Sequence, residues 1–206
     1  MKEIICSIVV RIIQLFEWLG IRWPVFGDWY RRLFYERMIN AEAEKCGLRP
    51  GMKILHIGSG PLPITSISLS LVGFSVVAVD SDPTAIQEAR KKVEEMGLCR
   101  KIKFLLADGA DISSGGFDAV WISLHVQQKE KVLKRAYSEL KPGGKIVFRN
   151  PRDWLSLIYP RIDMKQVFSG VECSKLRQKI GKETIVIEKP PLDIEMDAAS
   201  TRVAAN

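Results

Sequence analysis

Two glycines and the polar residues around them form the first segment of the chain whose spacing could do chemistry. Gly58-Ser59-Gly60-Pro61 directly follows an apolar run and precedes a helical pattern. Glycines at such a position let the backbone turn sharply and approach a ligand, and the following helix offers free N–H groups. Pro63 stands where the dinucleotide fingerprint G-x-G-x-x-G needs its third glycine, which argues against NAD or FAD. A nucleotide or nucleoside site remains the prediction.

Two aspartates follow the next two apolar runs. Asp80 comes twenty residues after Gly60, and Asp108 ends the third run. A carboxylate at the first distance can accept hydrogen bonds from both ribose hydroxyls at the carboxyl edge of a sheet. Asp108 could reach an adenine amino group or a loop N–H. The alternative for each is a helix-capping or turn residue.

Short β-rich runs alternating with helical patterns must position these residues. The strands are expected at 53–57, 75–79, 101–107, 117–123 and 145–149, and the helices at 64–72, 83–97 and 128–140. This alternation predicts an α/β fold with a doubly wound, mostly parallel sheet. Two extended runs, 167–180 and 183–189, flank a turn at Gly181-Lys182 and predict an antiparallel C-terminal hairpin at the sheet's edge, for seven strands in all.

The stretch from about Met52 to Arg149 resembles class I S-adenosylmethionine-dependent methyltransferases. The glycine loop, Asp80, Asp108 and a late KPGGK turn (141–145) occur in that family's order and spacing. The resemblance implies a Rossmann-like fold and S-adenosylmethionine as donor substrate, with the glycine loop against the methionine moiety, Asp80 on the ribose and Asp108 on the adenine. The donor site implied in this way consists of Gly58, Ser59, Gly60, Pro61, Asp80, Ser81, Asp108 and Gly109.

A narrower resemblance is to nicotianamine synthases, and it covers roughly residues 28–189. Residues 58–66 read GSGPLPITS and resemble that family's GSGPLPLTS signature. Arg149 followed by Tyr159-Pro160, and Tyr35 followed by Glu42, are similar to an arginine, a tyrosine-proline step, and a tyrosine and glutamate of the family. The resemblance implies transfer of an aminocarboxypropyl group from S-adenosylmethionine to a small amine or other nucleophile.

Five residues are the candidates for handling the acceptor. Glu42 is the expected base, with Tyr35 as its orienting neighbour. Arg149 is expected to bind a substrate carboxylate, and Tyr159 and His125 to contact the acceptor. The alternatives are an exposed Glu42 paired with a neighbouring lysine, a structural ion pair for Arg149, a packing role for Tyr159 and a loop position for His125. His56, inside a covered strand, is expected to be a hydrogen-bonded core residue.

The N-terminal 50 residues predict a helical lid or appendage before a donor-binding domain at 51–190 and a polar tail at 191–206. The first nineteen residues are apolar but carry Arg11 and Glu17, which argues for an amphipathic or buried helix. Aromatic and arginine residues are concentrated between 18 and 35. Residues 1–35 are therefore expected to cover the main domain, to contact a second copy of the chain, or to rest peripherally on a membrane.

Composition bounds the partners and the compartment. Lys and Arg number 31 against 24 Asp and Glu, a net charge of +7, and most of the excess lies between residues 129 and 182. We expect a solvated basic surface and a small-molecule acceptor, and do not expect nucleic acid as a partner. Four widely separated cysteines and two histidines predict no metal site and a cytoplasmic location.

Two other functions remain open from the sequence. One is a class I methyltransferase acting on a small or lipophilic acceptor, associated with a membrane through the N-terminal helix. The other is a non-catalytic module that binds S-adenosylmethionine or nucleic acid.

Overall fold

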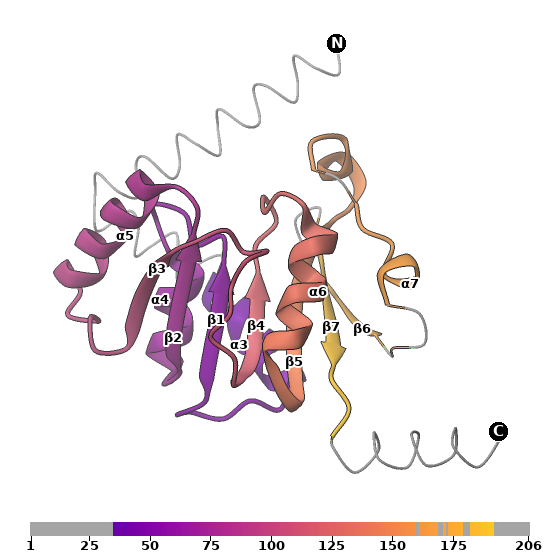
Figure 1. Ribbon diagram of the computed structural model, residues 1–206, viewed down its shortest axis with the longest axis horizontal. Coiled ribbons are helices and arrows are strands. Elements are labelled where there is room, and N and C mark those ends of the chain that lie inside the picture. Colours follow the sequence, from indigo (N-terminus) through magenta and orange to yellow (C-terminus); the bar gives the residue numbers. More distant parts are fainter. Residues whose placement is uncertain (1–34, 160, 169–170, 172, 179–181, 192–206) are drawn as a thin grey trace.

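The computed structural model describes residues 35–159, 161–168, 171, 173–178 and 182–191. Within them a seven-stranded sheet has the order β3-β2-β1-β4-β5-β7-β6 (Figure 1). Strands β1 to β5 pair in parallel, while β7 is antiparallel to both β5 and β6. The prediction of a doubly wound, mostly parallel sheet closed by an antiparallel C-terminal hairpin is confirmed.

The five parallel strands lie where apolar residues are dense in the sequence. They are β1 (Lys53–Ile57), β2 (Ser75–Asp80), β3 (Ile102–Leu106), β4 (Phe117–Ile122) and β5 (Leu140–Pro151). The hairpin consists of β6 (Cys173–Arg177) and β7 (Lys182–Glu188). The central strands are buried on both faces, as crossover helices require, and this explains their nearly continuous apolar sequences.

The helices connect these strands. They are α3 (Arg37–Lys45), α4 (Ile64–Val72), α5 (Pro83–Glu95), α6 (Lys129–Glu139) and α7 (Met164–Val167), with a 3₁₀ helix η2 (Asp153–Leu157) after β5. Helix α5 begins as predicted, because the Asp82 carboxylate accepts a hydrogen bond from the Thr84 N–H at 2.8 Å and Pro83 occupies the first turn.

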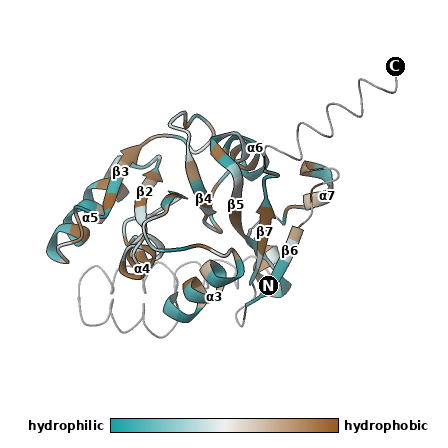
Figure 2. Ribbon diagram, turned by 90° about the horizontal axis from the view of Figure 1, so that it is seen from below, coloured by the Kyte–Doolittle hydropathy of each residue, from teal (hydrophilic) through white to brown (hydrophobic). Residues whose placement is uncertain are grey.

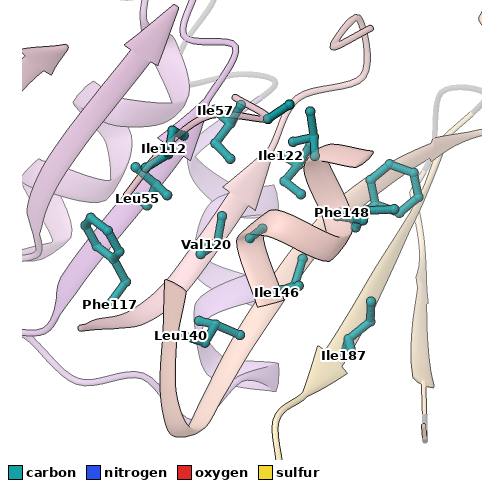
Figure 3. Close-up of a cluster of buried hydrophobic side chains, with 14 of the residues drawn as sticks. Leu55, Ile57, Ile112, Phe117, Val120, Ile122, Leu140, Ile146, Phe148 and Ile187 are labelled. Carbon is teal, nitrogen blue, oxygen red and sulfur yellow. The ribbon is translucent and has the colours of Figure 1, made fainter. Parts of the chain in front are cut away.

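Two apolar layers stabilise the sheet, one on each face. Figure 2 shows α3 and α4 on one side and α6 on the other. Alternate strand residues such as Leu55, Val120, Ile146 and Phe148 pack against α6 (Figure 3). Their neighbours in sequence point the other way, toward α3 and α4. This period of two decides which polar strand residues meet: His56, Trp121 and Arg149 all fall on the α3/α4 face.

Two local predictions were wrong. The KPGGK segment is not a free turn but an irregular part of β5, where Phe117 pairs with Leu140 and Ala119 with Lys145. The Gly143 N–H donates to the Lys189 carbonyl, and the Lys189 N–H donates to the Gly144 carbonyl, both at 2.9 Å, so the end of β7 holds it in the sheet. The first hairpin strand is also shorter than predicted, since residues 164–167 are helical and β6 begins at Cys173.

Residues 1–34 of the predicted N-terminal lid lie outside the described residues, as does the C-terminal tail from 192 onward. The helix described within the predicted lid is α3, which packs on α4. No helix within the described residues is both long and apolar enough to cross a membrane. The expected contacts of residues 1–34 with a membrane or a second copy stay predictions.

Candidate active site

The glycine loop leaves β1 at the carboxyl edge of the sheet in a conformation that favours glycine. Gly58 has φ +77° and Gly60 has φ +66°. A Cβ on Gly58 would lie 2.6 Å from the Cγ2 atom of Val126, so the loop after β4 packs directly on this backbone. A Cβ on Gly60 would meet no atom within 4 Å, so the loop is open at that residue.

The Ser59 hydroxyl, between these glycines, is one of the few buried polar atoms without a hydrogen-bond partner among the described residues. An orphaned buried hydroxyl is costly unless a ligand or water satisfies it. Half-buried Pro61 follows, and the loop then enters α4. The segment therefore fits a polar ligand group that approaches along the backbone.

Asp80 is held against the glycine loop. Its Oδ2 atom accepts a hydrogen bond from the Gly60 N–H at 2.7 Å, and its Oδ1 atom accepts one from the Asp82 N–H at 3.1 Å. The carboxylate is half-buried, and Ser81 beside it is exposed. The structure thus brings Gly60 and Asp80 together, and the binding of a ribose by Asp80 stays a prediction.

Asp108 lies at the same edge of the sheet, just after β3, and its side chain is exposed. Its Oδ1 atom accepts a hydrogen bond from the Ala110 N–H at 2.8 Å, which is the turn geometry named as the alternative for this residue. At the next residue a Cβ on Gly109 would lie 2.5 Å from the Cγ2 atom of Ile57, so this loop crosses the end of β1 closely. A role in adenine binding remains a prediction.

Glu42 is the centre of a buried polar cluster beneath this edge. Its carboxylate is fully buried, so the alternative of an exposed helix residue was wrong. Its Oε1 atom accepts hydrogen bonds from the Thr184 hydroxyl at 2.7 Å and from Arg149 Nε at 3.4 Å. Its Oε2 atom accepts hydrogen bonds from Arg149 Nη2 at 3.1 Å and from Trp121 Nε1 at 3.0 Å. Four donors therefore occupy the roughly four acceptor positions of a carboxylate.

Arg149 adopts the arrangement named as its alternative, an ion pair. It is buried and donates to the Thr65 hydroxyl at 3.1 Å in addition to its bonds with Glu42. Burial acts to lower the pKa of Arg149, but the adjacent Glu42 carboxylate outweighs it and raises that pKa above its ordinary value. The guanidinium is therefore permanently charged, and its binding of a substrate carboxylate remains a prediction.

Tyr35 joins this cluster from the start of the described chain. Its half-buried ring lies 5.8 Å from the Arg149 guanidinium carbon and 5.7 Å from Lys182 Nζ, both within cation–π range. The structure thus brings Tyr35, Glu42 and Arg149 together. Sequence reasoning missed Trp121 and Thr184, because nothing local to either residue marks it as a partner of a glutamate in α3.

The other two acceptor candidates lie on loops at the carboxyl edge. His125 is exposed in the segment between β4 and α6. Tyr159 is half-buried after η2, and its ring lies 5.9 Å from Lys129 Nζ. Their contact with an acceptor remains a prediction.

His56 links the glycine loop region to the end of β4. Its Nδ1 atom is 2.7 Å from the Ser66 hydroxyl in α4, and its Nε2 atom is 3.0 Å from the Ser123 hydroxyl. Burial, with the positive charge of Arg149 nearby, lowers the pKa of His56 to about 3. The prediction of a hydrogen-bonded core histidine is confirmed.

Acidification is expected to destabilise the fold through His56 before the carboxylates titrate. The unfolded chain takes up this proton below its ordinary value of 6.5, whereas the folded chain resists protonation down to about 3, so stability falls as the pH drops through that window. From pH 7 to 5.5 the free energy of unfolding should fall by about 1 kcal/mol, measured by urea denaturation.

Nuclear magnetic resonance gives the site-specific check. The His56 imidazole signals should not titrate between pH 5 and 8. A His125→Asn variant assigns the signals, since the chain has two histidines. A midpoint near 6.5 for His56 would contradict the buried neutral state.

The described residues contain no group of three or more histidine, cysteine or acidic side chains that could hold a metal ion. What the site offers instead is an open backbone loop, an orphaned hydroxyl and a carboxylate on adjacent strand ends. This combination suits a nucleoside ligand carrying a polar tail.

The sequence of residues 54–144 matches the profile of the family described as "Methyltransferase domain". This matched range carries the glycine loop, Asp80, Asp108 and His125. Arg149, Tyr159, Tyr35 and Glu42 lie outside the matched range.

The chain is also similar to two curated proteins. L-histidine 2-aminobutanoyltransferase of Yersinia pestis is 28% identical over 116 residues, 56% of this chain and 43% of that protein. The ubiquinone/menaquinone biosynthesis C-methyltransferase UbiE of Vibrio vulnificus is 24% identical over 162 residues, 73% of this chain and 62% of that protein. The chain thus spans less than two thirds of the length of either relative.

A solved structure covers more of the chain. A glutamate-to-glutamine variant of MtNAS in complex with S-adenosylmethionine matches with a TM-score of 0.76 at 19% identity, over 93% of this chain and 77% of that one. At this identity the likeness shows the fold alone, which is the Rossmann-like fold of the class I type.

Proposed function

We propose that the chain binds S-adenosylmethionine over the glycine loop and transfers its aminocarboxypropyl group to a nitrogen of a small amine. The observation that carries the proposal is the hydrogen bond from Gly60 to Asp80, which sets a carboxylate beside an open backbone loop at the carboxyl edge of β1 and β2. In this geometry Asp80 is available to the ribose and the Ser59 hydroxyl to the polar end of the methionine moiety.

Two likenesses support aminocarboxypropyl transfer over methyl transfer. The relative from Yersinia pestis is named for moving a 2-aminobutanoyl group to L-histidine, and MtNAS shares the fold over nearly the whole chain. The likeness to MtNAS is relevant because Glu42, Arg149 and η2 lie outside residues 54–144 but inside the range, roughly 28–189, that resembles nicotianamine synthases. We infer that this additional part of the site handles the acceptor.

The reaction is a displacement at carbon. The acceptor nitrogen attacks the carbon of the aminocarboxypropyl group attached to sulfur, a carbon–nitrogen bond forms, and the carbon–sulfur bond breaks. Its electron pair stays on sulfur, methylthioadenosine leaves, and the amine loses one proton to a base. Because the sulfonium charge is neutralised, the site mainly has to align the two reactants and exclude water.

Glu42 remains our candidate for that base, with Tyr35 as its neighbour. Its four acceptor positions are occupied, so one donor must give up its place when the acceptor binds. The Thr184 hydroxyl is the donor that can do so most easily, because rotation about its C–O bond redirects the hydrogen without moving the strand. Arg149 and Trp121 would continue to hold the carboxylate in position.

Product analysis tests which group is transferred. The protein is incubated with S-adenosylmethionine and L-histidine as a trial acceptor, or with a mixture of small amines, and the products are identified by mass spectrometry. The expected products are methylthioadenosine and an adduct about 101 Da heavier than the acceptor, because the aminocarboxypropyl group replaces one hydrogen of the amine. Adenosylhomocysteine with a methylated acceptor would contradict it.

Methyl transfer is the second candidate function. It is favoured by the match to UbiE, which covers more of this chain than the match to the Yersinia protein does. The same donor site serves both reactions, because which carbon of the sulfonium faces the acceptor decides which group moves. A lipophilic acceptor would then be expected, and the product assay with a quinone-type acceptor would show adenosylhomocysteine.

A further inference from the structure

Lys129 is a buried cation without a hydrogen-bonding partner among the described residues. The residue is 3% exposed, and Nζ is one of the few buried polar atoms left unsatisfied among the described residues. Nζ lies 5.9 Å from the ring centroids of two aromatic residues, Phe148 and Tyr159. Rings at that distance attract a cation weakly and leave its three N–H groups without acceptors.

The start of helix α6 adds two further unfavourable features at the same place. Gln128, the residue before the helix, has φ +47°, a left-handed conformation that is costly for a residue with a Cβ, and it provides no side-chain cap. Lys129 is then the first helical residue, where the helix dipole favours a negative charge rather than a positive one. An anion bound at this point would offset the buried charge, the uncapped N–H groups and the dipole together.

Lys129 begins a helix that lies near the loops expected to bind the donor and the acceptor. Helix α6 begins at the carboxyl edge of the sheet, at the end of the loop that follows β4 (Figure 1). Within that loop Val126 packs on Gly58 of the glycine loop. On its other side Lys129 faces Tyr159, one of the residues expected to contact the acceptor. The cation therefore lies beside Tyr159, at the start of a helix whose preceding loop packs on the glycine loop.

We propose that Lys129 binds the carboxylate of an α-amino acid group in the active site, an assignment that rests on the proposed function. That function supplies two sources of this chemistry, the carboxylate of the aminocarboxypropyl group of the donor and a carboxylate on the acceptor. Burial lowers the pKa of Lys129 to about 8, so the side chain still carries its charge at pH 7. A carboxylate there would accept hydrogen bonds from the N–H groups that no described residue accepts.

Calorimetric titrations with three probes separate the two sources. S-adenosylmethionine carries the donor carboxylate, methylthioadenosine lacks it, and L-histidine titrated in the presence of methylthioadenosine reports the acceptor. The variant is Lys129→Met, and the matched control is Lys134→Met, an exposed lysine on the same helix. Lys129→Met should weaken one carboxylate ligand about 10- to 100-fold and leave methylthioadenosine unchanged. Loss for S-adenosylmethionine assigns the donor carboxylate, and loss for L-histidine assigns the acceptor.

A second readout does not depend on activity. Because Lys129→Met removes a buried unpaired charge, it should raise the melting temperature of the ligand-free protein, whereas Lys134→Met should not. If Lys129→Met fails to fold, Lys129→Gln takes its place in the titrations. Unchanged affinities for all three probes in a folded variant would overturn this assignment alone. A wild-type protein that binds neither S-adenosylmethionine nor methylthioadenosine would overturn the proposed function, and this assignment with it.

Discussion

Glu42→Gln is expected to lower the free energy of unfolding by about 3 kcal/mol and the turnover of the folded enzyme about 10²- to 10⁴-fold. The first effect arises because Arg149 would be left as an uncompensated charge in a buried site. We place this loss of stability at the lower end of the range for broken buried ion pairs, because the amide oxygen of the glutamine would still accept one hydrogen bond. The second effect is the usual contribution of a general base. Urea denaturation and product formation under saturating donor measure the two separately.

Two companion variants separate the structural from the chemical role. Glu44→Gln, at an exposed position of the same helix, should change neither quantity. The double variant Glu42→Gln/Arg149→Met removes both charges, so it should recover part of the stability but none of the turnover. If Glu42→Gln were unstable yet fully active when folded, Glu42 would be only a positioning residue for Arg149 and Tyr35.

Asp80→Ala is expected to weaken S-adenosylmethionine binding by about 1–3 kcal/mol, roughly 5- to 150-fold, the range for lost charged hydrogen bonds. The change removes the proposed ribose acceptor and also frees the Gly60 N–H that Asp80 Oδ2 holds at 2.7 Å. Methylthioadenosine shares the ribose and should be weakened to the same degree. Isothermal titration calorimetry of both ligands provides the measurement.

Asp111→Ala is the matched control for this prediction. Asp111 is an exposed carboxylate near the same edge of the sheet, and its ion pair with Lys131 spans 3.9 Å at the surface. It should leave both affinities unchanged, because screened surface charges contribute little. An Asp80→Ala protein that binds both ligands like the wild type would exclude Asp80 from the donor site.

Local sequence signals account for the predicted position of the glycine loop and of Asp80 at one edge of the sheet. Strand β1 and the glycine turn after it are recognisable because an apolar run ends in residues that tolerate positive φ, as Gly58 and Gly60 do. The position of Asp80 can be predicted because one strand–helix–strand crossover separates it from the glycine loop. Its hydrogen bond with the Gly60 N–H is the structural result of that separation. The cap of α5 at Asp82 is local in the same sense.

Local signals failed where pairing between distant segments decided the outcome. The KPGGK segment has the composition of a turn, yet the end of β7 holds it inside β5 through hydrogen bonds with Lys189. Glycines permit a turn without requiring one, and the available backbone partners decided which conformation formed. Strand β6 is shorter than predicted, and its sequence does not alternate strongly between apolar and polar residues, so local signals did not mark its bounds.

The order of strands and helices, the glycine loop and its aspartate could be predicted, because each depends on residues within one strand–turn–helix unit. The burial of Glu42 could not, because its partners Trp121, Arg149 and Thr184 lie 79, 107 and 142 residues further along the chain. Long-range packing also encloses Lys129 without a hydrogen-bond partner among the described residues. Strand register and the packing of helices across the sheet set these contacts, and neither is encoded in any short stretch of residues.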